Sequence, residues 1–365
     1  MSSGGASREV ALRPGYHSPQ VEVDVRLNTN EAPEPPPAAL VEALADELRS
    51  ISLNRYPDRE ATALRAALAA HHGVDPAQVF CANGSNEVIQ CLLLAYGGPG
   101  RPAMVFEPTY ALHSHIARIT GTPLITGRRD KAFAVQPAEV ERTVASAAGE
   151  HWPQGPAVSF LCSPNNPTGG AETPDNVRSV LALVGGILIV DEAYGQFAPW
   201  SALELLGSEP RLVVVRTFSK TWAMAGLRLG YAIADPGVVA SVSNVALPYH
   251  LDALKQVAGR LAVGFKAEMA ERVAAIIKER ERVSLSLEAL PVEVWPSSAN
   301  FILFRVMQRT GSQVWQGLLH RSVLIRDVSD WPGLEGCLRV TIGTPLENDR
   351  FLSALFEVLS EPGGA

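Results

Sequence analysis

Short apolar segments and amphipathic helical segments alternate between residues 78 and 215, and this alternation constrains the fold more than any other feature. The apolar segments have the length of buried strands and are bounded by polar or turn-forming residues. Strands separated by helices form βαβ units, so we predict an α/β fold with a mostly parallel central sheet. The predicted strands are Gln78–Ala82, Ala103–Phe106, Leu124–Thr126, Ala157–Cys162, Gly186–Val190 and Leu212–Val215. The predicted helices between them are Ser85–Tyr96, Ala111–Thr120, Pro137–Ala147 and Asp175–Val184.

The segments on either side of this region have a different pattern. Residues 1–36 are irregular and rich in proline and glycine, although Val21–Val25 alternates like a short edge strand. About forty residues from 250 to 290 are helical by period, and a smaller α+β pattern follows them. We therefore predict an N-terminal arm (1–36) that joins the small domain and a large domain (37–250). A spine helix and a small C-terminal domain are predicted for residues 251–365.

The composition excludes several classes of protein. Hydrophobic residues make up 47% of the 365 residues, which is enough for a substantial core. The net charge of −7 gives no electrostatic basis for binding nucleic acid. No segment approaches the roughly 20 apolar residues of a membrane span, and the N-terminus lacks the apolar stretch of a signal peptide. We therefore expect a cytoplasmic protein with no membrane partner.

Neither the cysteines nor the histidines form a pattern typical of a metal site. The four cysteines are scattered along the chain, at Cys81, Cys91, Cys162 and Cys337. Cys81 and Cys162 lie in apolar runs, so we predict that they are buried. His113 and His115 are two residues apart, but no acidic ligand set accompanies them. A position on a helix surface is therefore predicted for these histidines, and no metal is expected.

Polar motifs follow the predicted strands, at the edge where parallel sheets bind ligands. The segment NGSNE follows the first strand, and Gly84, Ser85 and Asn86 begin a helix there. Free backbone N–H groups and the helix dipole favour a phosphate at such a position, although the segment is also typical of an ordinary helix N-cap. The segment SPNNPTG follows the fourth strand, and its two prolines fix a backbone from which Asn166 faces the same edge.

An aspartate and a lysine follow the next two strands. Asp191 ends an apolar run and is costly to bury without a partner, for which a cationic ring nitrogen is suited; a helix N-cap is the alternative. Lys220 follows the last strand, and Arg228 lies eight positions further on. Alone, Lys220 is equally typical of a solvated strand end. With Tyr194 of VDEAY, these groups match the phosphate, phenolic oxygen, pyridinium nitrogen and aldehyde of pyridoxal 5′-phosphate.

The chain resembles the fold-type I pyridoxal-phosphate aminotransferases over nearly its whole length, from about residue 13 to residue 350. The motifs SPNNPTG, VDEAY and SK…GLRLG are highly specific for this superfamily. The terminal segments favour the histidinol-phosphate aminotransferase branch. The matching segments, in order, are LNTNEAP, LNRYPD, NGSNE, FEPTY, SPNNPTG, VDEAY, TFSKTWAMAGLRLGY, SSANFILF, VLIRD and LRVTIGTPLEND.

The resemblance implies a role for each matching residue around the cofactor. Lys220 corresponds to the lysine that binds the cofactor aldehyde covalently, and Asp191 pairs with the pyridine nitrogen. With Tyr194 they form the catalytic set, in which Lys220 takes the Cα proton of the amine and returns it to the cofactor. The other implied cofactor contacts are Asn166 and Tyr194 at the phenolic oxygen, Tyr110 stacked on the ring, and Ser219, Arg228, Gly84, Ser85 and Asn86 at the phosphate.

Further residues correspond to substrate contacts and to a subunit interface. Arg339 matches the arginine that binds the substrate's anionic group, while Arg326 and Tyr16 match contacts to the substrate phosphate. Asn166 also faces the substrate. Tyr56 of LNRYPD corresponds to a tyrosine that reaches the phosphate in the partner subunit's site, which implies a homodimer. The chain departs from the family at Asn86, where an aspartate is more frequent, and at Ala32, where an asparagine is more frequent.

The implied reaction is transamination of L-histidinol phosphate with 2-oxoglutarate, which gives imidazole acetol phosphate and glutamate. Two other reactions are compatible with the same scaffold: transamination of an aromatic amino acid, and decarboxylation of an amino-acid phosphate. A non-catalytic sensor that binds pyridoxal phosphate is an alternative of a different class, but such sensors carry a DNA-binding domain for which no residues remain here.

Overall fold

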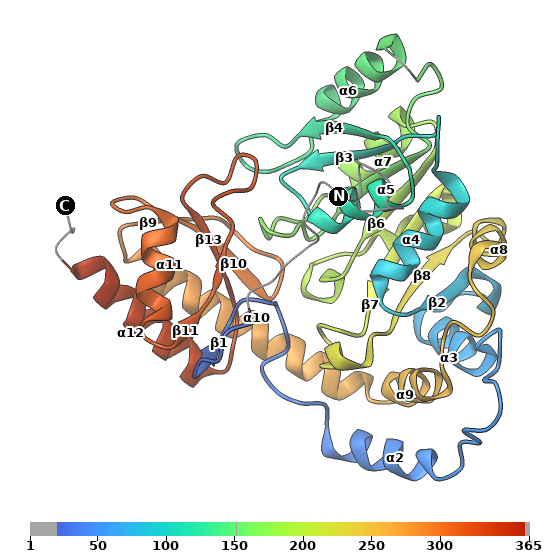
Figure 1. Ribbon diagram of the computed structural model, residues 1–365, viewed down its shortest axis with the longest axis horizontal. Helices are drawn as coiled ribbons and strands as arrows, with labels where there is room; N and C mark the ends of the chain where they lie inside the picture. Colours follow the sequence, from blue (N-terminus) through green and yellow to red (C-terminus); the bar gives the residue numbers. More distant parts are fainter. Residues whose placement is uncertain (1–19, 151, 362–365) are drawn as a thin grey trace, which may run out of the picture.

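The computed structural model describes residues 20–150 and 152–361. Its two parts are a large lobe built on a seven-stranded sheet and a smaller lobe built on a four-stranded sheet (Figure 1). The strand order in the large sheet is β2-β8-β7-β6-β5-β3-β4. These strands are β2 (Val79–Ala82), β3 (Ala103–Glu107), β4 (Leu124–Arg128), β5 (Val158–Cys162), β6 (Ile187–Asp191), β7 (Leu212–Thr217) and β8 (Gly230–Ala234).

The large sheet is parallel except for β8, which runs antiparallel to both β2 and β7. Because β8 reverses direction between them, β2 and β7 run the same way. The carboxyl ends of β2, β3, β5, β6 and β7 therefore lie along one edge, together with the start of β8. The predicted α/β fold with a mostly parallel sheet is confirmed.

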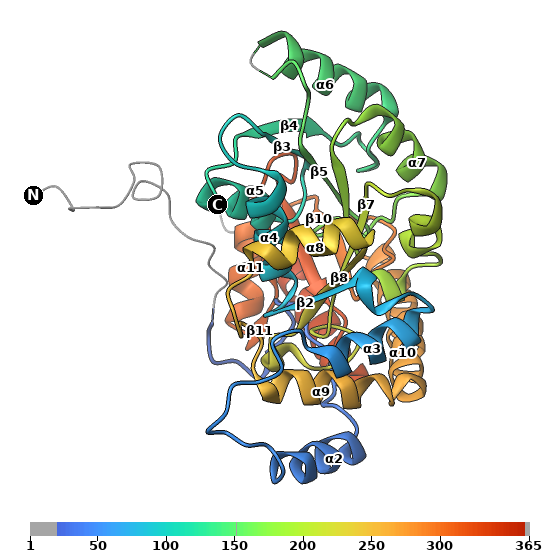
Figure 2. The same cartoon turned by 90° about the vertical axis from the view of Figure 1, so that its right-hand side faces the viewer.

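Alternate side chains of the sheet pack against helices on its two faces. In β7, Val213 and Val215 join one apolar cluster, whereas Leu212 and Val214 join another. The first face is covered by α4 (Ser85–Tyr96), α5 (Ala111–Ile119) and α8 (Pro236–Val245), and the second by α6 (Pro137–Glu150) and α7 (Pro174–Leu183). Figure 2 shows α5 and α7 on opposite sides of the strands. Burial on both faces explains why these strands are apolar runs rather than alternating segments.

The small sheet has the order β12-β13-β10-β9 and is antiparallel. Its strands are β9 (Val292–Val294), β10 (Phe301–Val306), β12 (Arg326–Asp327) and β13 (Cys337–Thr341), with helices α11 (Gly311–Leu319) and α12 (Pro345–Ser360) packed beside them. The edge strand expected at Val21–Val25 is present only as β1 (Val25–Arg26). This strand pairs in parallel with β11 (Val323–Leu324), so this part of the chain lies against the small lobe.

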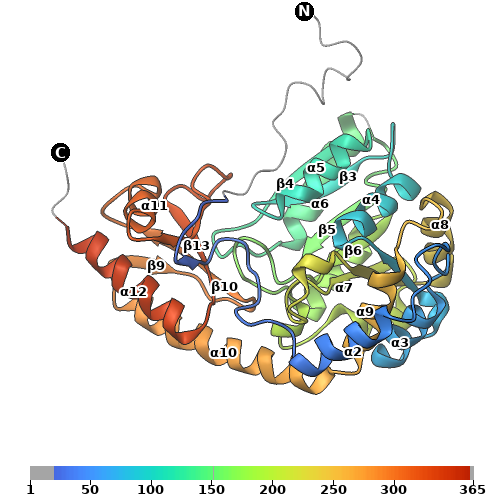
Figure 3. The same ribbon diagram turned by 60° about the horizontal axis from the view of Figure 1, so that its bottom comes forward.

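The stretch from residue 250 to residue 290 is helical, as predicted, but it is not one uninterrupted spine helix. The structure has two helices there, α9 (Ala253–Val263) and α10 (Lys266–Glu288), separated at Gly264 and Phe265. Figure 3 shows α10 extending from the large lobe beneath the small one. The remaining helices are α2 (Ala38–Leu48) and α3 (Thr62–His72). Within the described ranges, no helix is long and apolar enough to cross a membrane.

Candidate active site

A cavity of about 370 Å³ lies at the carboxyl edge of the large sheet. The predicted residues that line it come from five strand ends and from the small sheet. They are Ser85, Asn86, Tyr110, Asn166, Asp191, Tyr194, Ser219, Lys220, Arg228 and Arg339. Three residues from the N-terminal part of the chain, Thr29, Asn30 and Glu31, also line it. Residues as far apart in the sequence as Thr29 and Arg339 thus meet in one cavity.

Lys220 follows β7, and its Nζ atom donates a hydrogen bond to the carbonyl oxygen of Thr29 at 2.9 Å. The pKa of Lys220 is lowered from 10.5 to about 7, mainly because burial removes the ammonium group from water. The positive charges of Arg339 and, to a smaller extent, Arg228 contribute to this lowering, whereas Glu31 opposes it. At neutral pH a large fraction of Lys220 is therefore the free amine, which is the form that attacks an aldehyde.

Asp191 is the last residue of β6, and only 1% of its surface is exposed. Its Oδ1 atom accepts a hydrogen bond from the backbone N–H of Ala193 at 3.1 Å. Its Oδ2 atom lies 2.9 Å from Nε2 of His113. No lysine or arginine in the described ranges forms an ion pair with this carboxylate. The negative charge of Asp191 is therefore available to a cation in the cavity.

His113 does not lie on the helix surface, and that prediction was wrong. Its side chain is fully buried and stacks on Phe160, with ring centroids 4.5 Å apart. The Tyr110 ring meets it edge-on at 5.4 Å. A signal for this position exists in the sequence, because His113 shares helical spacing with the buried residues Ile116 and Ala117. In the part of the chain that the structure describes, no group of acidic residues, cysteines and histidines is arranged to hold a metal ion.

The start of α4 lies beside Arg228 and Ser219, an arrangement that is suited to an anion. Gly84 caps this helix with a φ of +82°, a conformation that favours glycine. A Cβ atom on Gly84 would lie 2.8 Å from a guanidinium nitrogen of Arg228. The Arg228 side chain in turn donates to Oγ of Ser219 at 3.3 Å. Backbone N–H groups, a guanidinium and a hydroxyl thus converge, as phosphate recognition requires.

Tyr194 and Asn166 reach the cavity from different strand ends and do not bond to each other. The Tyr194 hydroxyl accepts a hydrogen bond from Nδ2 of Asn30 at 2.9 Å. Burial raises the pKa of Tyr194 above its usual value, so its phenol keeps its proton. Asn166 instead accepts a hydrogen bond from the buried Arg339. Arg339 also donates to the carbonyl oxygen of Asn28 at 2.7 Å.

The structure does not bring every predicted site residue to this cavity. Tyr56 is 81% exposed and stacks on Tyr249, with ring centroids 4.5 Å apart. Arg326 is half-buried and does not line the cavity, although its strand β12 places it directly opposite Arg339 on β13. Tyr16 lies outside the described residues.

Three features of the cavity test whether pyridoxal phosphate fits it. An aldehyde needs an amine that is not fully protonated, a pyridinium nitrogen needs a carboxylate, and a phosphate needs an anion-binding site. Lys220, Asp191 and the start of α4 supply these groups, and all three contribute to the lining of the same cavity. The residues present therefore fit this cofactor.

Comparison with known proteins agrees with this geometry. Residues 22–355 match the family model for aminotransferases of class I and II. The chain belongs to this family. It is 47% identical to a histidinol-phosphate aminotransferase from Frankia casuarinae, in an alignment that covers 94% of this chain and 88% of that protein. It is 43% identical to the enzyme of that name from Corynebacterium diphtheriae, over 97% of this chain and 96% of the other.

Solved structures share the fold of this aminotransferase. One is a histidinol-phosphate aminotransferase from Sinorhizobium meliloti in complex with pyridoxal-5′-phosphate, with a TM-score of 0.82 and 23% identity over 93% of this chain and 91% of the other. Another is an aspartate aminotransferase variant from Thermus thermophilus, with a TM-score of 0.81 and 20% identity over 98% of this chain and all of that one. The predicted family and fold type are thus confirmed.

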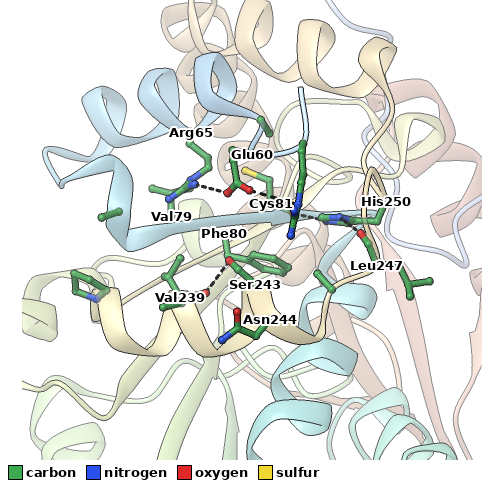
Figure 4. Close-up of a pocket in the computed structure, with 16 residues that line it drawn as sticks. Glu60, Arg65, Val79, Phe80, Cys81, Val239, Ser243, Asn244, Leu247 and His250 are labelled. Carbon is green, nitrogen blue, oxygen red and sulfur yellow. Dashed lines mark hydrogen bonds and ion pairs between the residues drawn. The ribbon is translucent and has the colours of Figure 1, made fainter. Parts of the chain in front are cut away.

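The aminotransferase has a second cavity of similar volume, but it contains none of the predicted site residues. It lies between β2, the start of α3, and α8 with the loop that follows it (Figure 4). In this cavity His250 bonds to the carbonyl oxygen of Cys81 at 2.9 Å, and Arg65 lies 3.6 Å from Glu60. Its charged groups are thus paired or bonded to the backbone, and it has no lysine for an aldehyde.

Proposed function

We propose that this aminotransferase binds pyridoxal 5′-phosphate and transfers the amino group of L-histidinol phosphate to 2-oxoglutarate. The products are imidazole acetol phosphate and glutamate, in the biosynthesis of histidine. The observation that carries the proposal is that Lys220, Asp191 and the start of α4 meet in one cavity. The names of relatives that are 43–47% identical over most of the chain support histidinol phosphate as the amino donor.

Lys220 has two tasks in this reaction. Its amine, whose pKa is lowered to about 7, binds the cofactor aldehyde covalently. Once the substrate amine has replaced Lys220, the lysine is a free base. It removes the proton from the substrate Cα and returns that proton to the cofactor. Bound pyridoxal phosphate supplies an electron sink, which makes that Cα proton acidic.

Asp191 lines the cavity, and His113 contacts its carboxylate from outside the lining. The buried carboxylate of Asp191 favours a proton on the pyridine nitrogen, because a cation there satisfies its charge. His113 Nδ1 has no hydrogen-bond partner among the described residues. Because a carboxylate oxygen accepts, Nε2 is the atom that carries a proton in this contact, and its hydrogen bond to Asp191 fixes the direction of the carboxylate.

Arginines recognise the anionic groups of cofactor and substrate in this proposal. Arg228, Ser219 and the start of α4 hold the cofactor phosphate. Arg339 offers a planar fork that matches a carboxylate or a phosphate, and it already contacts Asn166 in the cavity. Arg326 is one strand away from Arg339, and we assign it and Tyr16 to the substrate phosphate. Tyr110 stacks on the cofactor ring, and Asn166 and Tyr194 bond to its phenolic oxygen.

We also propose that the protein is a homodimer in which Tyr56 contacts the cofactor phosphate of the partner subunit. The exposure of Tyr56, which stacks on Tyr249, supports this proposal. Two exposed leucines add apolar surface: Leu53, close to Tyr56 in the sequence, is 83% exposed, and Leu247, close to Tyr249, is 77% exposed. We further propose an N-terminal arm (1–36), a large domain (37–250), and a spine helix with a small C-terminal domain (251–365). The seven-stranded and four-stranded sheets, which lie within residues 79–234 and 292–341, support this division. The four buried cysteines are unpaired, which supports a cytoplasmic location.

A comparison of amino donors tests the proposed reaction. The purified protein is loaded with pyridoxal phosphate, and the rate at which each amine changes the visible absorbance of the bound cofactor is measured. We expect histidinol phosphate to have a higher kcat/KM than phenylalanine, with glutamate formed when 2-oxoglutarate is added. Preference for phenylalanine indicates an aromatic aminotransferase, release of carbon dioxide indicates a decarboxylase, and binding without turnover indicates a sensor. Lys220→Ala is the control, and it abolishes both turnover and the visible band.

A further inference from the structure

Asn30 makes the only hydrogen bond that the described residues give to the Tyr194 hydroxyl. Its side chain is 1% exposed and lines the active-site cavity. Its Nδ2 atom donates to the Tyr194 oxygen at 2.9 Å, across 164 positions of sequence. Its backbone has a φ of +56°, a left-handed conformation that asparagine and glycine adopt more readily than other residues. The backbone conformation and the burial together place the amide at Tyr194.

The contacts of Asn30 determine which way its amide group faces. Its backbone N–H donates to Oγ1 of Thr341 at 3.0 Å. Oδ1 of Asn30, at 3.0 Å, is the only acceptor that the described residues give to the Thr341 hydroxyl, so the hydroxyl proton is donated to it. The backbone oxygen of Asn30 accepts from Asn300 at 3.2 Å. Because Oδ1 faces Thr341, the NH₂ group of the amide faces Tyr194. The amide can therefore donate a hydrogen bond to the Tyr194 hydroxyl but cannot accept one from it.

A donor at this position controls the Tyr194 proton. Because Asn30 Nδ2 fills an acceptor site of the Tyr194 oxygen, the tyrosine cannot donate its own proton to Asn30. That proton has no acceptor among the described residues and is directed into the cavity. A hydroxyl that accepts one hydrogen bond is also a stronger donor in another, since hydrogen bonds in a chain polarise each other.

We propose that Asn30 is a positioning residue that directs the Tyr194 hydroxyl proton to the phenolic oxygen of the cofactor. This inference rests on the proposed function, in which Tyr194 contacts that oxygen. A strong hydrogen bond from Tyr194 makes the phenolic oxygen a weaker base. The oxygen then holds the proton of the neighbouring Lys220 nitrogen less tightly, so the nitrogen loses it at a lower pH. Thr341 and Asn300 of the small lobe hold Asn30 in place, so the small lobe also determines where this proton points.

The experiment measures the pH midpoint of the visible absorbance band in the cofactor-loaded protein. Asn30→Gly removes the side chain and keeps the left-handed backbone without strain. We expect it to raise the midpoint by about half a pH unit, the amount that corresponds to one neutral hydrogen bond. Asn30→Asp replaces the donor by an acceptor that takes the Tyr194 proton away from the cofactor, so we expect a larger rise.

The same variants in a Tyr194→Phe background separate this effect from a general effect of residue 30. With phenylalanine at 194 there is no proton to direct, so Asn30→Gly should no longer change the midpoint. Asn30→Asp should keep only the part of its shift that comes from its added charge. Equal shifts in the two backgrounds, or no shift with tyrosine present, would overturn the proposal.

Two further measurements keep the test decisive. Thermal unfolding of each variant shows whether it folds. If the Asn30 variants do not fold, Thr341→Val replaces them, because it removes only the hydroxyl that orients the Asn30 amide. This variant should raise the pH midpoint by a smaller amount, and only when Tyr194 is present. A wild-type protein without a visible band, or a band that survives Lys220→Ala, contradicts the proposed function itself. A normal band that lacks coupling between Asn30 and Tyr194 contradicts only this inference.

Discussion

His113 Nε2 lies 2.9 Å from Oδ2 of Asp191, and neither side chain is accessible to solvent. The two residues are 78 positions apart, and α5 and β6 bring them together beneath the cavity. A buried carboxylate without donors is unfavourable, so this contact stabilises the fold as well as the site.

His113→Phe should therefore lower the free energy of unfolding by about 3 kcal/mol, because it leaves the buried Asp191 carboxylate with one donor fewer. The loss of a hydrogen bond to a charged group should also lower kcat/KM by roughly 10- to 100-fold. Urea denaturation and donor kinetics measure the two effects. His113→Gln retains an N–H donor and is the matched control, for which we expect losses several times smaller. Equal losses in the two variants would show that ring packing rather than the hydrogen bond matters.

The lowered pKa of Lys220 predicts a pH dependence of stability in the protein without cofactor. The unfolded chain keeps the lysine proton up to the ordinary pKa of 10.5, whereas the folded protein loses it near 7. Between these values the unfolded state holds more protons, so this contribution to the free energy of unfolding rises as the pH increases from 7 to 10.5. Below pH 7 both states are protonated, and the folded state carries the full cost of the buried charge.

Urea denaturation of the apoprotein and of Lys220→Met at several pH values measures this contribution. We expect the difference between the two proteins to change in favour of the wild type as the pH rises. The rate at which the apoprotein gains a visible band with pyridoxal phosphate should also increase through a midpoint near pH 7. Lys131→Met, which removes an exposed lysine, should leave both profiles unchanged. A reaction midpoint near 10 would contradict the prediction.

Gly230 provides a test of the anion-binding site at the start of α4. A Cβ atom at this position would lie 2.3 Å from the backbone nitrogen of Ser85 and 2.5 Å from the carbonyl carbon of Gly84. Gly230→Ala must therefore displace the start of α4, and we expect a loss of about 1–3 kcal/mol in stability and at least roughly a tenfold loss in cofactor affinity.

Fluorescence titration of the apoprotein with pyridoxal phosphate measures the affinity of this variant. Gly207→Ala is the matched control, because a Cβ atom at Gly207 meets no atom within 4 Å. If both variants bind the cofactor as the wild type does, the close approach of Gly230 to α4 does not shape the phosphate site.

The sequence predicts the strands of the large sheet well because their burial on both faces makes them apolar runs. The end of β7 shows the limit of this signal. The prediction stopped at Val215, but the strand continues through Arg216 and Thr217. Arg216 is buried because it forms an ion pair with Glu192, in which Nη2 and Oε2 are 2.6 Å apart. The local sequence pattern does not contain the ion-pair partner of such a charged residue. It therefore indicates the end of a strand where the strand continues.

The strand-end motifs likewise predict which residues share the active-site cavity, because parallel strands deliver their carboxyl ends to one edge. Contacts across long distances in the sequence carry no such local signal. The pairing of Asn30 with Tyr194 depends on how the N-terminal segment lies against the small sheet, and no spacing rule describes that. The burial of His113, in contrast, has a local signal, because a spacing of three residues places it on the same helix face as the buried Ile116.

The exposure of Tyr56 leads to a test of the proposed dimer by mixing two impaired subunits. Tyr56→Phe removes a hydroxyl proposed to bond to the charged phosphate, so cofactor affinity should fall by roughly 10- to 100-fold. Lys220→Ala abolishes activity. If Tyr56 acts in the partner subunit, a mixed dimer contains one site with Lys220 from one chain and Tyr56 from the other.

Both subunits are refolded together at a cofactor concentration that fills wild-type sites but leaves Tyr56→Phe sites mostly empty, and activity is compared with that of each variant refolded alone. Because one of the two sites in a mixed dimer is intact, and random mixing makes half of the dimers mixed, we expect activity to recover to about one quarter of the wild type. If Tyr56 instead acts within its own chain, every site carries a defect and mixing restores nothing. Size-exclusion chromatography establishes that the mixture is dimeric, so a failure to recover activity then contradicts the exchange of Tyr56 between subunits.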